Sequence, residues 1–170
     1  MKALLATAAA AAFVIATPAF AQAGPQTNAT ANADAVIVTP ISIIKTADLN
    51  FGRIAADTAA STVTIDVSGN RTSSNPNVLI AAGSSPTAAA FTVTGEPGLA
   101  YTPTFQTTPI ALNGPTGSTP MSASLAGLAD SFTLDSSGNA HITVGGVLNV
   151  GANQTAGAYH GTLQVNVQYN

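Results

Sequence analysis

The sequence has no cysteine and no tryptophan, and only 6% of its residues are charged. Without cysteine, the chain can form no disulfide, no thiolate nucleophile and no cysteine-based metal site. Without tryptophan, it lacks the side chain on which carbohydrate-binding modules most often stack sugar rings. Its four basic residues are scattered and stand against seven acidic ones, so they cannot follow a phosphate backbone. We therefore expect no nucleic-acid partner.

Residues that could carry catalysis are few and lie in no recognised spacing. The two histidines, His141 and His160, fall in predicted strands and have no second ligand at a metal-binding spacing. Asp66, Asp130 and Asp135 could in principle bind calcium, but the sequence DSSGN that begins at Asp135 is typical of a hairpin turn. The hydrolase motif G-x-S-x-G is missing. These patterns predict a protein that is not an enzyme and has no catalytic residue, metal or cofactor.

The first 21 residues have the features of a bacterial signal peptide. One basic residue, Lys2, precedes an apolar run from Ala3 to Ala16, and an A-x-A cleavage site ends at Ala21. The run is short for a bilayer span, and no stop-transfer charges follow it. We therefore expect cleavage before Gln22, no membrane span in the mature chain, and export through the periplasm to the cell surface or beyond.

Residues 22–34 form a small, polar stretch that we interpret as a flexible N-terminal extension. Alanines alternate there with polar residues, and this period of two is the spacing of a β-strand with a small-residue face. The extension is therefore a candidate donor strand, and residues 35–170 have the length of one domain. The alternating face of this candidate donor strand continues into the β-branched run that follows. It consists of Ala29, Ala31, Ala33, Ala35 and Ile37.

The rest of the chain reads as a series of short strands separated by turn residues. Each strand is rich in Val, Ile, Thr, Tyr or Phe, and no segment keeps an apolar pattern at helical spacing. This rhythm predicts an all-β sandwich, with a long loop at Thr107–Pro120. The candidate strands are Ile41–Ile44, Leu49–Gly52, Ser61–Val67, Val78–Ala82, Ala90–Thr94, Tyr101–Gln106, Met121–Leu125, Ser131–Leu134, Ala140–Val144, Val147–Val150 and Gly157–Tyr169.

The last of these strands has the most regular pattern. Apolar or small residues alternate with polar ones from position 157 to position 170 without an exception. A strand of this length either spans a whole sandwich or offers its edge to a partner strand. The side chains on its apolar face are Gly157, Tyr159, Gly161, Leu163, Val165, Val167 and Tyr169.

The C-terminal pattern resembles two families of exported bacterial proteins. The penultimate aromatic residue, Tyr169, and the earlier glycine, Gly157, are similar to the C-terminal motif of chaperone–usher pilins. Residues 146–150, 154–159 and 165–169, together with Leu49-Asn50-Phe51-Gly52, resemble spore-coat protein U type domains. The chain therefore looks like a member of an uncharacterised family of secreted, pilin-like domains.

The resemblance implies an immunoglobulin-like, pilin-like sandwich that lacks one strand. A periplasmic chaperone would fill the gap, and an usher would replace it with the N-terminal extension of the next subunit. The resemblance makes Gly157, Tyr159, Leu163, Val165, Val167 and Tyr169 the strand-exchange and chaperone-binding residues.

Two hypotheses for function remain open on the sequence. The first is a structural subunit of an extracellular pilus-like fibre or coat that self-associates by β-strand exchange. The alternative is a self-contained secreted β-sandwich that binds a surface glycan or a matrix component. The two differ in whether the sandwich is complete by itself.

Overall fold

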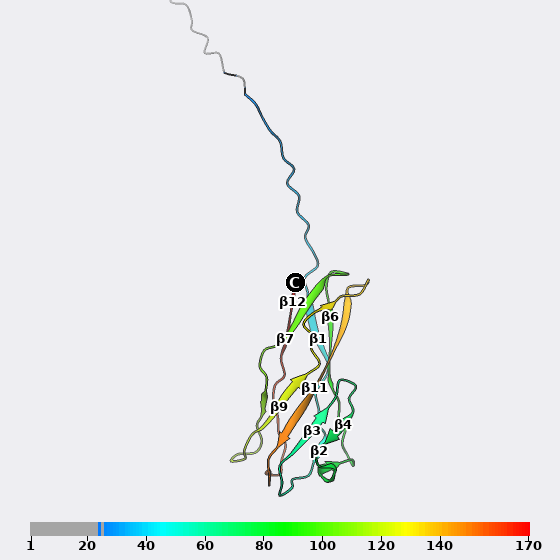
Figure 1. Cartoon of the computed structure of the whole chain (residues 1–170), viewed down its shortest axis with the longest axis vertical. Coiled ribbons are helices and arrows are strands. Elements are labelled where there is room, and N and C mark those ends of the chain that lie inside the picture. The colour runs from blue at the N-terminus through cyan, green and yellow to red at the C-terminus, as the bar shows by residue number, and fades with distance from the viewer. Residues whose placement is uncertain (1–23, 25) are drawn as a thin grey trace, which may run out of the picture. The chain divides into compact units, whose positions relative to one another are not determined.

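The computed structural model describes residue 24 and residues 26–170, so the expected signal peptide lies outside the described residues. The chain divides into two units, Met1–Val36 and Ile37–Asn170. In the first unit, the described residues are exposed and belong to no strand or helix. All strands in the described part of the chain lie in the second unit (Figure 1).

The second unit is all-β, as the sequence predicts. Apart from one turn of 3₁₀-helix at Pro76–Val78, its regular elements are strands. These strands are β1 (Ser42–Ala47), β2 (Arg53–Ile54), β3 (Ser61–Ile65), β4 (Arg71–Ser73), β5 (Leu79–Ile80), β6 (Ala89–Thr94), β7 (Ala100–Phe105), β8 (Ile110–Leu112), β9 (Met121–Ala126), β10 (Phe132–Thr133), β11 (Asn139–Val150) and β12 (Val165–Tyr169).

The larger sheet is organised around β11, the longest strand. The first half of β11 pairs with β6, and its second half pairs with both β3 and β9. The sequence predicts two strands here, separated at Gly145-Gly146, but the structure has one. A Cβ atom on Gly145 would lie 2.3 Å from the carbonyl oxygen of Ile65. Glycine therefore allows the neighbouring backbone to approach closely at the point where β11 changes partners.

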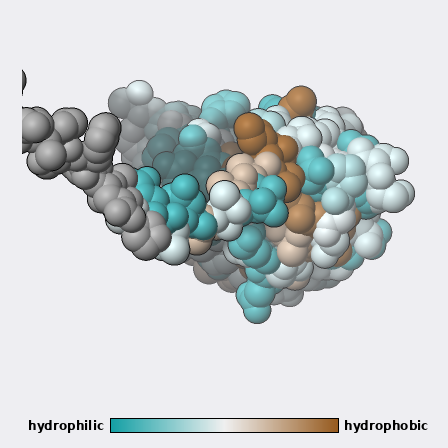
Figure 2. All heavy atoms as spheres, turned by 90° about the horizontal axis from the view of Figure 1, so that it is seen from above, coloured by the Kyte–Doolittle hydropathy of each residue, from teal (hydrophilic) through white to brown (hydrophobic). Residues whose placement is uncertain are grey.

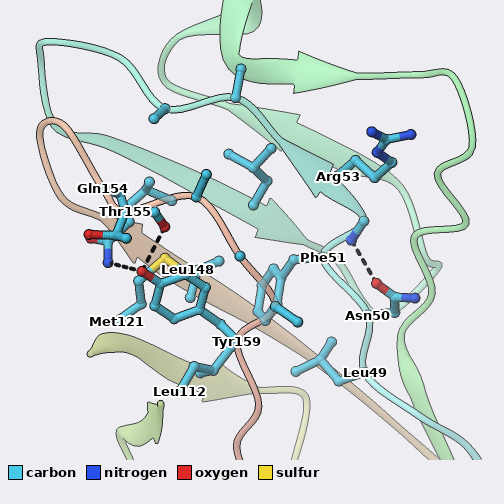
Figure 3. Close-up of a pocket in the computed structure, with 18 residues that line it drawn as sticks. Leu49, Asn50, Phe51, Arg53, Leu112, Met121, Leu148, Gln154, Thr155 and Tyr159 are labelled. Atoms are coloured by element: carbon cyan, nitrogen blue, oxygen red, sulfur yellow. Dashed lines mark hydrogen bonds between the residues drawn. The ribbon is translucent and has the colours of Figure 1, made fainter. Parts of the chain in front are cut away.

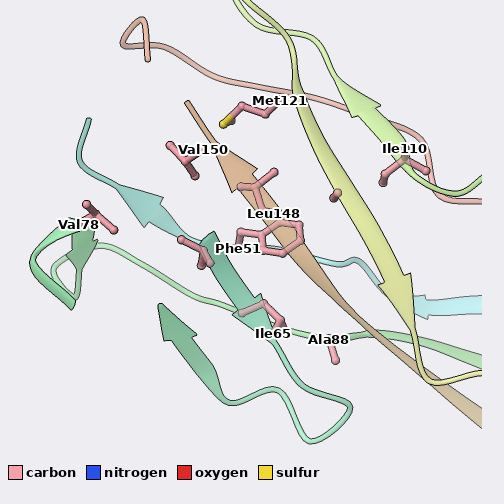
Figure 4. Packing of buried hydrophobic residues seen from close by; sticks show 10 residues of the cluster. Phe51, Ile65, Val78, Ala88, Ile110, Met121, Leu148 and Val150 are labelled. Atoms are coloured by element: carbon pink, nitrogen blue, oxygen red, sulfur yellow. The ribbon is translucent and has the colours of Figure 1, made fainter. Parts of the chain in front are cut away.

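The second layer of the sandwich consists of two small sheets. One has the order β10-β7-β12, which makes β12 an edge strand, and the other pairs β2 with β5. Two hydrophobic clusters separate the layers. The first includes Phe51, Val63, Ile65, Val78, Met121, Leu148 and Val150 (Figure 4). The second includes Phe91, Val93, Tyr101, Leu134, Ile142, Val144 and Val165.

Alternation along the strands produces this core. In β3, the residues Ser61, Val63 and Ile65 are buried, while Thr62 and Thr64 are partly exposed. Hydroxyl and amide side chains thus supply much of the outer surface, as the low charge content predicts. Figure 2 shows one face of this surface as mostly pale and teal, with a band of apolar residues across it.

Three predicted elements are wrong in detail. The C-terminal strand begins only at Val165, because residues 157–164 lack a neighbouring ladder and make a single bridge, between His160 and Asn113. The predicted loop Thr107–Pro120 contains β8, which pairs with β9 and buries Ile110. The predicted strand Leu49–Gly52 is reduced to one bridge, between Asn50 and Thr87.

We predict that Tyr101→Phe leaves the free energy of unfolding unchanged or raises it by about 1 kcal/mol, measured by urea denaturation. The Tyr101 side chain is fully buried, and its hydroxyl has no hydrogen-bond partner among the described residues. Desolvation also raises the pKa of this hydroxyl. In the control Tyr159→Phe, the lost hydroxyl has two partners, so stability should fall by about 1 kcal/mol. A larger loss for Tyr101→Phe than for the control would contradict the structure.

Candidate functional site

A groove lies where the second layer of the sandwich is incomplete. One wall is the segment 45–56, which runs from the end of β1 through β2, and the other is the segment 154–163, which leads into β12. Two hollows of about 480 and 530 Å³ share Leu49, Phe51, Leu112 and Tyr159, so they form one continuous groove. We call this the strand groove (Figure 3).

The floor of the strand groove is the hydrophobic core itself. Met121, Leu148 and Val150, all members of the first cluster, line the first hollow. Phe91 and Ile110 line the second hollow. These floor side chains are themselves buried, so a ligand would bury mainly the partly exposed apolar side chains of the groove, such as Leu49, Leu112 and Leu163. Burial of apolar surface contributes about 25 cal/mol per Å².

The C-terminal wall keeps the alternation of the sequence without forming a ladder. Tyr159 and Leu163 are partly buried, whereas His160, Thr162 and Gln164 are exposed. The Tyr159 hydroxyl accepts a hydrogen bond from Nε2 of Gln154 and donates one to the carbonyl oxygen of Thr155, both at 2.8 Å (Figure 3). These bonds fix the tyrosine ring against the floor, where it packs on the first cluster.

The N-terminal wall is fixed by the guanidinium group of Arg71. Its Nη1 donates to the carbonyl oxygens of Phe51 and Arg53, both at 3.2 Å. It also donates to Oγ of Ser84 at 3.1 Å, and Nη2 donates to the carbonyl oxygen of Ile80 at 3.1 Å. Gly52 has a φ angle of 77°, and a Cβ there would lie 2.5 Å from Nη1. Arg71 thus holds the wall and the two-stranded β2–β5 sheet together.

A third, smaller hollow of about 260 Å³ continues the strand groove between β1 and β12. It shares Lys45, Phe91 and Leu163 with the second hollow and extends to Ile43 and Asn166. The groove therefore follows the edge strand β12 and the free edge of β1, each of which pairs with one other strand.

The structure brings some of the predicted strand-exchange residues together. Gly157, Tyr159, Leu163 and Val165 line the strand groove or its continuation. Val167 and Tyr169 instead pack against the second cluster, outside the hollows. The predicted donor residues are all exposed and unpaired; they are Ala29, Ala31, Ala33, Ala35 and Ile37.

Two of the three aspartates considered as calcium ligands, Asp66 and Asp135, accept hydrogen bonds within turns. Asp66 accepts hydrogen bonds from the side-chain and backbone nitrogens of Asn70 and from the backbone of Ser68, and these bonds lower its pKa. Asp135 accepts from the backbone nitrogens of Asn139 and Ser137, which likewise lower its pKa. Among the described residues, no three acidic or histidine side chains gather as a metal site. The two carboxylates close the turns that the sequence predicts.

One comparison with known proteins gives a family. The profile described as "Domain of unknown function (DUF4402)" matches residues 41–169. The chain belongs to the DUF4402 family. No curated protein and no solved structure matched it. The DUF4402 match includes both walls of the strand groove and begins after the exposed run Val36–Val38.

The described part of the chain has no helix long and apolar enough to cross a membrane.

For this DUF4402 domain we predict that Arg71→Met lowers the free energy of unfolding by about 2–3 kcal/mol, because three carbonyl oxygens lose a charged donor. Arg53→Met is the matched control, since its guanidinium makes one long bond, of 3.4 Å, to the carbonyl oxygen of Ala82. The control should change stability by no more than about 0.5 kcal/mol in urea denaturation. Equal losses for the two variants would show that Arg71 does not fix the wall.

Proposed function

We propose that this protein is a secreted, non-catalytic structural subunit of an extracellular pilus-like fibre or coat, and that its copies assemble by β-strand exchange. The observation that carries the proposal is the strand groove. Its floor is the hydrophobic core, and beside it residues 48–52 and 154–163 make only isolated bridges, at Asn50 and His160.

A β-strand is the ligand that this geometry fits best. Residues 157–164 alternate like a strand but make one isolated bridge, so most of their backbone groups are available to a partner. In β-augmentation, such main-chain groups supply affinity, and pockets for alternate side chains supply specificity. An edge left open beside an apolar floor is otherwise an aggregation hazard that exported proteins must cover.

The N-terminal segment of a second copy is the proposed donor. Val36 and Ile37 are 90% and 96% exposed, although β-branched side chains normally pack in sheets. The thirteen residues 26–38 can extend to about 43 Å, while the ten residues 154–163 span at most about 33 Å. The segment is therefore long enough to run along the whole strand groove.

Within the donor, Ile37 is the main hydrophobic anchor of its face. The other members of that face are alanines, which cover little apolar surface each. Full burial of an isoleucine side chain contributes about 2 kcal/mol, which is roughly a thirtyfold change in affinity. Loss of this single side chain should therefore be visible in assembly.

The resemblance to chaperone–usher pilins and spore-coat protein U domains supplies the proposed route. A periplasmic chaperone would cover the strand groove after export, and an usher would exchange it for the donor of the next copy. The alternative, a self-contained secreted sandwich that binds a glycan or matrix component, predicts instead a stable monomer with an unoccupied groove.

We predict that the mature chain forms multimers, visible as a ladder of bands on an unheated gel, and that Ile37→Arg abolishes this ladder of bands. The arginine would place a charge against the apolar floor, and removing that charge from water is costly. Val36→Arg is the matched control, because Val36 is adjacent, similarly exposed and on the opposite face of the donor. The control should keep the ladder.

Both substitutions are at exposed positions, so both variants should keep the thermal midpoint of the sandwich. Loss of the ladder in both variants, or in neither, would remove the support for Ile37 as the anchor. A wild-type chain that remains monomeric at all concentrations would favour the self-contained sandwich.

A further inference from the structure

Strand exchange between copies raises a difficulty that a tethered donor always has. A segment joined to its own domain by a short linker has an effective concentration in the millimolar range. If the donor could enter the groove of its own chain, it would exclude donors of other copies at micromolar protein concentration by about a thousandfold. Assembly therefore requires a restraint that keeps the donor out of its own groove.

A hydrogen-bonded cluster lies at the base of the donor, one residue beyond Val38. The backbone N–H of Thr39 donates to Oε2 of Glu96 at 2.9 Å. The Tyr169 hydroxyl donates to the carbonyl oxygen of Thr39 at 2.8 Å and accepts from the backbone N–H of Glu96 at 2.6 Å. The cluster thus joins Thr39, the turn after β6 and the penultimate residue of the chain.

The local backbone is shaped to accept this tyrosine. A Cβ atom on Gly95 would lie 2.2 Å from the Tyr169 hydroxyl and 3.0 Å from Cδ1 of Leu134. A side chain at position 95 would therefore displace the hydroxyl from Thr39. The Tyr169 ring itself packs against the second hydrophobic cluster, which fixes the position of the hydroxyl.

The hydrogen bonds of this cluster prevent Thr39 and Pro40 from joining a β-ladder. Both backbone polar groups of Thr39 are bound to side chains, and Pro40 has no N–H to donate. A hairpin that turned the donor back beside β1 or β12 would have to break these bonds. The strand β2, which lines the first hollow of the strand groove, also lies at the end of the sandwich opposite to the C-terminus (Figure 1).

We propose that Thr39, Glu96 and Tyr169 form a latch that keeps the N-terminal segment out of the strand groove of its own chain, so that the groove accepts the segment of a second copy. The inference rests on the proposed function. It assigns to Tyr169 a role different from groove lining: the tyrosine acts on the donor of its own chain.

Thiol cross-linking of the full mature chain tests the latch, because the natural sequence has no cysteine. Ala33→Cys labels the donor, and Thr162→Cys labels the C-terminal wall of the groove. With the latch intact, a short bis-maleimide reagent should join different copies and give dimers and larger species. With Tyr169→Phe added, at least tenfold more of the product should be cross-linked within one chain.

Glu96→Ala is the second latch variant, because it removes the acceptor for Thr39 without changing the tyrosine that packs in the core. It keeps the test decisive if Tyr169→Phe fails to fold. Gln168→Ala, next to the latch and exposed, is the control and should leave the cross-links between copies unchanged. A ratio of products that is the same in both latch variants and in the parent would overturn the latch. Predominant cross-linking within one chain in the parent would overturn it as well.

A second thiol pair separates failure of the latch from failure of strand exchange. Ala33→Cys with Thr64→Cys places the second thiol on β3, away from the residues that line the groove. If this pair cross-links as well as the groove pair, the donor has no preference for the groove and the proposed function fails. If the groove pair is preferred but the latch variants change nothing, strand exchange stands and the latch is wrong.

Discussion

The pairing of backbone groups in β-ladders is the constraint on which this molecule depends. The chain has no cysteine, and the single ion pair among its described residues, Lys45 with Asp48, is exposed. Such a pair contributes little to stability. The sandwich is therefore held by ladders and by the two hydrophobic clusters that the ladders enclose. Where a ladder is missing beside the core, a hollow reaches down to its buried side chains.

The strand groove is the place where such a ladder is missing. The strand β11 has partners along its whole length, whereas residues 157–164 have the sequence of a strand and almost no partner. The N-terminal segment has the converse property, since it is exposed and β-branched near Ile37. A groove without a strand and a segment without a sheet are complementary. The proposed latch around Thr39 would direct that complementarity to contacts between copies.

The sequence correctly predicts those strands in which apolar and polar residues alternate and which have a neighbouring strand to pair with. Residues 61–65, 89–94 and 100–105 become β3, β6 and β7 within one or two residues of the predicted bounds. It mispredicts residues 157–164, because alternation specifies which side chains turn inward but not whether a neighbouring strand exists. Tyr159 and Leu163 accordingly face the core from a segment that is not a strand.

The remaining parts of the site depend on contacts between distant residues. Arg71 holds the wall through carbonyl oxygens of Phe51 and Ile80, and nothing in the sequence around it indicates such partners. The resemblance to pilins makes Tyr169 a strand-exchange and chaperone-binding residue, but its hydroxyl binds Thr39 of its own chain. The groove itself is a gap in the second layer, and a gap leaves no motif in the sequence.

The central claim is that residues 157–164 acquire a ladder only when copies assemble. Amide hydrogen exchange, measured on the monomeric and the assembled mature chain, tests this directly, with β11 as the internal reference. The account predicts fast exchange along 157–164 in the monomer and exchange slower by at least about a hundredfold in the assembly. Equal exchange along 157–164 in the two states would contradict it.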